Sequence, residues 1–159
     1  MSAITHMTVD ADEFLLGRVL SRDPGAEVEL ERAVPAANQV MPYLWVAGVQ
    51  LPEFERRVRT SPHVRRLVAV DVVNNQGMYR IEWADDGESL LHGIRETGAT
   101  ILSARGADTW KFVLQFEDYG GLARFHNYCR QKDIDVSLDM AYSPDELEAT
   151  SEYDRRTEL

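Results

Sequence analysis

One order of predicted elements, strand-helix-strand-strand-helix-strand, occurs twice in succession along the chain. Alternating apolar residues indicate the strands, and apolar residues three and four apart indicate the helices between them. The first copy is expected to place its strands at residues 4–9, 27–34, 43–47 and 67–73. The second is expected to place them at residues 78–83, 99–105, 110–116 and 136–142. A repeat constrains the whole topology, because each copy must bury its apolar faces against another part of the chain.

Turn and capping residues set the boundaries of these elements. Pro52 suits the first turn of a helix, and Ser61-Pro62 stops that helix before the next strand. Asn74-Asn75 predicts a hairpin-like junction between the two copies. Asp118 is expected to cap the last helix, which carries Phe125 and Cys129 on one side. Local signals therefore agree with the repeated order.

The predicted fold class is α+β, with two tandem ferredoxin-like (βαββαβ) halves whose antiparallel sheets pack together. The halves are expected at residues 1–74 and 75–143. Residues 144–159 have many charges and no apolar period, which predicts a linker or mobile tail. One continuous eight-stranded α+β sheet uses the same elements and is the alternative.

Charge and hydropathy restrict the partners. The net charge is −10, from 27 acidic against 17 basic side chains, and this argues against direct binding of nucleic acid. Lys111 and Lys132 are the only lysines, a balance typical of a protein from a salt-rich cytoplasm or from a GC-rich genome. The sequence shows no transmembrane segment and no secretion signal, so we expect a cytoplasmic protein with no membrane partner.

The residues that usually carry catalysis are scattered. The four histidines form no metal-ligand pair, and there is no phosphate-binding glycine loop or nucleophile elbow. We therefore predict no catalytic residues, no metal, no cofactor and no enzyme activity. His126 and Cys129 lie one turn apart on a predicted helix, which makes them candidates for a redox or metal site. The alternative is that Cys129 is a small core residue and His126 has a structural role.

Aromatic residues on the predicted strands are the main candidates for a binding site. An apolar space between two sheets with a few polar groups is typical of a small-ligand pocket. With one histidine added, the candidate ligand-binding residues are Tyr43, Trp45, Tyr79, Trp83, Trp110 and His126. A filled aromatic core is the alternative, because protein interiors are close-packed.

Three stretches carry a family resemblance: MPYLWV at 41–46, YRIEW at 79–83 and FHNYCR at 125–130. With these blocks, and with VELERAVP upstream at 28–35, the chain resembles the N-terminal domain of haloarchaeal bacterio-opsin-activator-type (Bat-like) helix-turn-helix transcriptional regulators. The resemblance covers roughly residues 1–143. It also favours the halophilic explanation of the acidic composition.

The resemblance implies a ligand-sensing or signal-transmitting domain that contacts DNA only through a separate C-terminal helix-turn-helix. No helix-turn-helix pattern fits residues 144–159, so the chain is expected to be a fragment cut at the domain boundary, or else a natural partner without its own reader. A small-molecule effector and a homodimer are the expected partners. The alternatives are a ligand-free dimerisation module and a small α+β enzyme.

Overall fold

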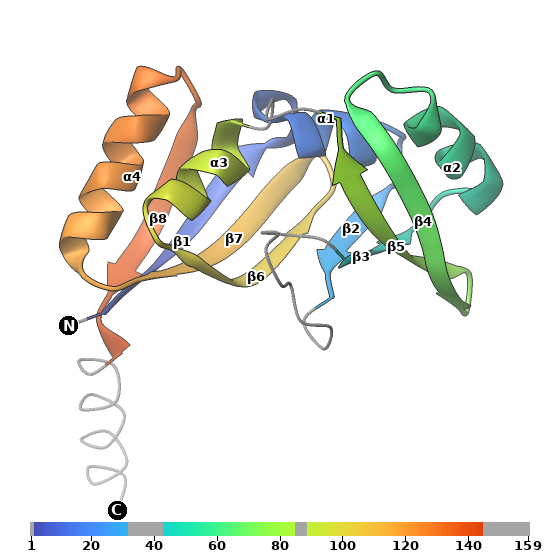
Figure 1. Cartoon of the computed structure of the whole chain (residues 1–159). Coiled ribbons are helices and arrows are strands. Elements are labelled where there is room, and N and C mark those ends of the chain that lie inside the picture. The colour runs from blue at the N-terminus through green and yellow to red at the C-terminus, as the bar shows by residue number, and fades with distance from the viewer. Residues whose placement is uncertain (1, 32–42, 85–88, 145–159) are drawn as a thin grey trace, which may run out of the picture.

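The computed structural model of the chain describes residues 2–31, 43–84 and 89–144, and all eight of its strands belong to one antiparallel sheet (Figure 1). The first copy of the repeat consists of β1 (Ala3–Asp10), the 3-10 turn η1 (Ala11–Glu13), α1 (Leu15–Leu20), β2 (Glu27–Leu30), β3 (Tyr43–Ala47), α2 (Leu51–Arg59) and β4 (Val64–Val73). The second consists of β5 (Gln76–Trp83), α3 (Ser89–Glu96), β6 (Thr100–Gly106), β7 (Thr109–Phe116), α4 (Tyr119–Gln131) and β8 (Val136–Tyr142). The α+β class and the twice-repeated order are therefore confirmed. The strand predicted at 27–34 is described only in its first part, and its end lies outside the described residues.

The strands do not form two sheets that pack face to face. Their order across the single sheet is β4-β5-β3-β2-β6-β7-β1-β8. The first strand of each copy lies among strands of the other copy, because β1 pairs with β7 and β8 while β5 pairs with β3 and β4. As a result, all eight strands lie side by side in one layer. This arrangement matches the alternative prediction of one continuous eight-stranded sheet.

Two groups of four strands meet at a narrow contact. We call β4-β5-β3-β2 the β4 half-sheet, β6-β7-β1-β8 the β8 half-sheet, and the β2–β6 contact the seam. Within the described residues, whose first range ends at Glu31 just after β2, the seam consists of two residue pairs, Val28 with Gly106 and Glu29 with Arg105. By comparison, β1 and β7 pair over eight residues. The described backbone contact between the half-sheets is therefore shorter than the contacts within them, of which the shortest, β2–β3 and β3–β5, each have four pairs.

The junction between the two copies is a tight hairpin. Asn74 and Asn75 have φ of 50° and 64°, the left-handed backbone that a two-residue hairpin turn of this kind requires. The division expected at residue 74 falls in this turn, and the two flanking strands β4 and β5 pair from Val64–Trp83 to Val73–Gln76. The predicted hairpin is confirmed.

The helices lie on one face of the sheet, which we call the helix face, and the core lies beneath them (Figure 1). Each helix presents an aromatic or aliphatic residue to buried strand residues; Phe54 of α2, for example, contacts Tyr79 with ring centroids 5.4 Å apart. Phe125 of α4 contacts Phe116 at 5.7 Å. The predicted cap of α4 is confirmed, since Asp118 Oδ1 accepts a hydrogen bond of 2.8 Å from the Gly121 amide. The opposite face, which we call the open face, has none of the described helices packed on it.

Helix α1 and the turn after it cross the seam on the helix face. Ser21 Oγ accepts a 3.0 Å hydrogen bond from Trp110 Nε1 of β7, in the β8 half-sheet. On the other side, Arg57 of α2 donates to the Val19 carbonyl at 2.7 Å and to Asp23 at 3.0 Å. This short segment is therefore bonded to elements of both half-sheets. None of the helices in the described ranges is long and apolar enough to cross a membrane.

Candidate functional site

A cavity on the open face lies across the seam. It has a volume of about 400 Å³, and residues of both half-sheets line it. The β4 half-sheet contributes chiefly Glu27, Glu29, Trp45 and Ala47, and the β8 half-sheet contributes chiefly Arg105, Thr109 and Lys111. A larger groove of about 1070 Å³ lies at the start of α2, but two of its charged groups, Arg57 and Asp23, are already paired with each other. The seam cavity is the better candidate site, because it combines charged and aromatic groups from both half-sheets.

Four side chains in this cavity form a row across four neighbouring strands. Lys111 of β7 lies opposite Arg105 of β6, Arg105 lies opposite Glu29 of β2, and Glu29 lies opposite Trp45 of β3. Directly opposite residues of antiparallel strands project to the same face, and neighbouring strands lie about 4.8 Å apart. The row therefore carries two cations, one carboxylate and one indole, in that order.

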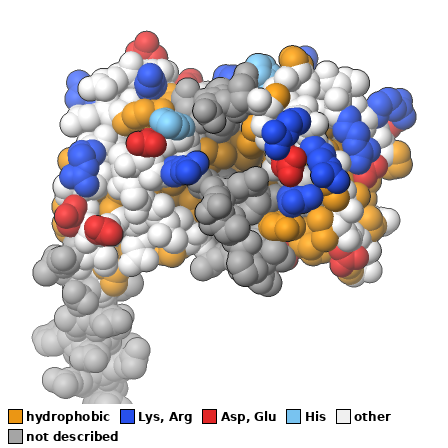
Figure 2. All heavy atoms as spheres, viewed as in Figure 1, with side chains coloured by type: hydrophobic (Ala, Val, Ile, Leu, Met, Phe, Trp, Pro, Cys, Tyr) orange, Lys and Arg blue, Asp and Glu red, His pale blue; other side chains and the backbone are white. Residues whose placement is uncertain are grey.

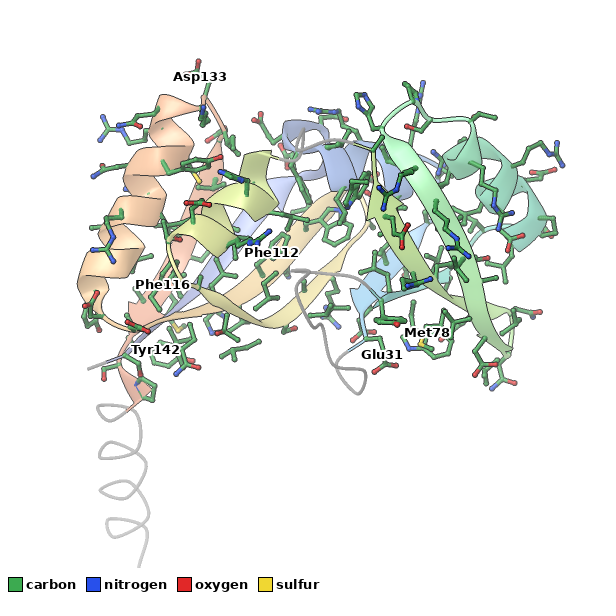
Figure 3. The ribbon with its side chains drawn as sticks, in the orientation of Figure 1. Glu31, Met78, Phe112, Phe116, Asp133 and Tyr142 are labelled. Carbon is green, nitrogen blue, oxygen red and sulfur yellow. The ribbon has the colours of Figure 1, made fainter. Side chains whose placement is uncertain are left out.

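Trp45 has Glu31 and Met78 as neighbours on the open face. Its Nε1 donates a short hydrogen bond to the carboxylate of Glu31, and Met78 lies opposite Trp45 on β5. Figure 3 labels Glu31 and Met78. Tyr43, two residues before Trp45, lies on the same face opposite Arg80. Both aromatic residues are half-buried, so part of each ring remains accessible.

Two of the other predicted ligand-binding residues belong to the core on the helix face. Tyr79 is 2% exposed and Trp110 is 0% exposed. Each ring lies over a glycine of the sheet, since a Cβ on Gly77 would come within 2.6 Å of the Tyr79 ring and one on Gly106 within 2.2 Å of the Trp110 ring. Burial, followed by the nearby Glu55 carboxylate, raises the pKa of Tyr79 to about 12. Tyr79 and Trp110 therefore belong to a filled aromatic core, which was the alternative to a ligand pocket.

The remaining candidates lie apart from the seam. Trp83 is half-buried at the end of β5, opposite Val64, and packs against the core. His126 is exposed on α4, whereas Cys129 is 1% exposed and its burial raises the pKa of the thiol to about 11. Because the Cys129 thiol is buried in the core and His126 is exposed, the structure does not place the two side chains in one accessible site. Among the described residues, no group of three His, Cys, Asp or Glu side chains could hold a metal ion.

The charged members of the row could not be singled out as site residues from the sequence. Glu27 and Glu29 could be placed on an exposed strand face from their alternation with Val28 and Leu30. Nothing in the sequence indicated that Arg105 would lie beside Glu29, because the two residues are far apart in the chain and meet only through the seam. Of the six predicted ligand-binding residues, the structure places only Trp45 in the lining of this cavity.

The comparisons with known proteins agree with the resemblance found in the sequence. The family model described as "BAT: GAF and HTH_10 associated domain" matches residues 6–156. No curated protein and no solved structure matches the chain.

Proposed function

Because the chain belongs to the BAT family, the GAF and HTH_10 associated domains, we propose that it is the regulatory domain of a haloarchaeal DNA-binding transcriptional regulator and senses or transmits a signal. In this proposal a helix-turn-helix outside the described residues reads the DNA. The net charge of −10 supports a role that leaves the phosphate backbone to another domain. The excess of carboxylates over basic side chains supports a halophilic source.

The observation that carries the proposal is the narrow seam between the two half-sheets. A change in the angle between the half-sheets would disturb two residue pairs, while the longer pairings inside each half-sheet stay intact. On the helix face, the α1 segment is bonded to α2 and to β7, so movement at the seam would shift it relative to both. A signal that favours one angle would therefore reach elements at both ends of the sheet.

The strand order supports a further part of this proposal. In a ferredoxin-like unit the strands lie in the order 4-1-3-2, and each half-sheet has this order if the first strands of the two copies have changed places. We propose that the half-sheets are ferredoxin-like units with exchanged first strands. The exchange gives two covalent crossovers between the units, which would keep them together while the seam bends.

The test is a charge reversal at the seam, made in the native host. Glu29→Arg places a third cation beside Arg105 and weakens one of the two seam pairs, since like charges directly opposite each other are destabilising. We expect deletion of the gene to change a set of transcripts, the wild-type gene to restore them, and the Glu29→Arg gene to fail to restore them. The control is Glu96→Arg, because Glu96 is also an exposed glutamate but lies on α3, outside the seam pairs and the cavity lining. If Glu29→Arg restores transcription as fully as the wild type, the seam has no part in regulation.

A second candidate function, dimerisation, has a specific observation in its favour. Three valines near the hairpin end of β4 are unusually exposed: Val70 at 46%, Val72 at 59% and Val73 at 47%. Figure 2 shows hydrophobic side chains gathered at this end of β4 and β5. Pairing of the β4 edge with another strand is hindered, because Arg59 donates to the Leu67 carbonyl and Asp71 accepts from the Val72 amide. A homodimer would therefore use the valine side chains more than the strand edge.

Light scattering on the purified chain tests this second candidate. If the valines form a homodimer contact, the wild-type mass is that of a dimer, and Val72→Lys shifts the dissociation constant upward by about tenfold or more because it buries a charge in an apolar contact. Ser137→Lys, on the exposed side of the opposite edge strand, should leave the mass unchanged. A wild-type monomer at high concentration would remove dimerisation through this surface.

A further inference from the structure

The two cations of the seam cavity, Arg105 and Lys111, have one carboxylate near each of them. Glu29 lies opposite Arg105. A hydrogen bond from Thr8, and to a lesser extent the charge of Lys111, lowers the pKa of the Asp139 carboxyl. Neither carboxylate forms a close ion pair with these cations. Lys111 and Arg105 lie directly opposite each other, and like charges in that position repel. Among the ion pairs within the described ranges, none includes either residue. Both side chains are exposed and face the cavity. A phosphate group placed between them would relieve the repulsion, and the planar guanidinium of Arg105 suits bidentate contact with it.

The carboxylate of Glu29 lies next in the row and would repel a second phosphate. A carboxylate can instead accept hydrogen bonds from two neighbouring hydroxyl groups, which is how acidic residues bind ribose in other nucleotide sites. Glu29 lies between the cation pair and Trp45, so a sugar would come between a phosphate and a ring. This order excludes a ligand that is anionic along its whole length.

Trp45 supplies the last contact in the row. Its indole N–H donates to Glu31, which orients the ring, and the half-buried ring lines the cavity. Planar bases stack on aromatic side chains with little dependence on base identity. From Lys111 to Trp45 the row crosses three strand spacings, about 14 Å in total, and the cavity volume of about 400 Å³ lies within the range of small-ligand sites.

We propose that the seam cavity binds a nucleoside monophosphate, with the phosphate on Arg105 and Lys111, the ribose on Glu29 and the base on Trp45. This inference rests on the proposed regulatory function and names the class of effector for it. The ligand touches both half-sheets, so its affinity depends on the angle between them. Binding would therefore favour one arrangement of the seam.

The test uses AMP, GMP, CMP and UMP with the purified chain, at low salt and in molar KCl, followed by calorimetry and tryptophan fluorescence. We expect saturable binding of at least one nucleotide, with quenching that Trp45→Phe removes. Arg105→Gln and Lys111→Gln should each weaken binding by about tenfold or more, since each removes a charge-assisted contact. Arg95→Gln is the matched control, because Arg95 is exposed on α3 and outside the cavity lining. Circular dichroism checks that the variants are folded.

Three results would overturn the proposal. The first is that none of the four nucleotides binds at millimolar concentration. The second is that both Arg105→Gln and Lys111→Gln bind as the wild type does. The third is that inorganic phosphate binds as tightly as the nucleotide, which would leave Glu29 and Trp45 without a role. None of these results affects the transcription experiment with Glu29→Arg, which needs no added ligand, so failure of the ligand class and failure of the regulatory function are distinguishable.

Discussion

Residues 1–74 and 75–143, expressed as two separate chains, will each fail to fold, and mixing them will restore the native sheet. In the intact chain, β1 lies between β7 and β8, and β5 lies between β3 and β4. Residues 1–74 alone therefore have β1 and β4 without any of their described strand partners. The same holds for β5 and β8 in the second fragment. Neither fragment can bury the apolar faces of these strands, so each should show the spectrum of an unfolded chain.

The two fragments are measured by circular dichroism and by their amide spectra. Each fragment is measured alone, and the two are then measured as a mixture at equal concentration. We expect folded signals only in the mixture, with a transition that depends on concentration. A fragment of residues 11–74, which lacks β1, serves as the control and should not restore the sheet, because β7 and β8 both pair with β1. Cooperative folding of residues 1–74 alone would show that the first copy is an independent unit and that the strand exchange is not required.

Much of the local structure could be predicted from the sequence. Pro52 lies in the first turn of α2, Asp118 caps α4, and Asn74-Asn75 forms the hairpin turn, because each depends on the backbone within a few residues. The resemblance to the Bat-like associated domain is confirmed by the family match over residues 6–156. Signals of this kind report which elements form and where they end.

The pairing of the strands could not be predicted in the same way. The alternation of apolar residues in β1 and β5 predicts which side chains face the core. It does not predict which strand lies next to each of them, because any neighbouring strand with an apolar face would fit. The choice between two packed sheets and one exchanged sheet is therefore made by long-range contacts. Trp110 illustrates this limit. Its clean alternation with Phe112 and Phe116 predicted a buried face, and the structure shows Phe112 and Phe116 on the helix side (Figure 3). Whether that face bordered a pocket or a filled core depended on α1 and Phe14.

The candidate site shows the same division. Trp45 could be singled out, because an aromatic residue at a strand centre is a common ligand contact. Glu29, Arg105 and Lys111 could not, since their proximity arises only when β2 and β6 meet at the seam. The row of four side chains is a product of the topology.

The second large effect that we expect is a change in the distance between the two half-sheets when Glu29 is replaced by Arg. Spin labels at Arg56→Cys on α2 and Asn127→Cys on α4 report this distance, because α2 packs on β4 and α4 packs on β1 and β7. Both sites are exposed, and the native Cys129 is buried and should react slowly. Glu29→Arg replaces an opposite-charge pair, worth roughly 0.2–1 kcal/mol, by a like-charge pair. This cost is small beside a typical folding free energy of about 5–15 kcal/mol, so the half-sheets should stay folded.

The distance distribution between these labels tests most directly whether the seam is where the molecule changes shape. We expect Glu29→Arg to shift or broaden the distribution by several ångströms relative to the wild type, on the order of one strand spacing. Glu96→Arg, on α3 and outside the cavity lining, should leave it unchanged. An identical, narrow distribution in wild type and Glu29→Arg, with both proteins folded, would show that the two half-sheets form one rigid body and would contradict the proposed mechanism of signal transmission.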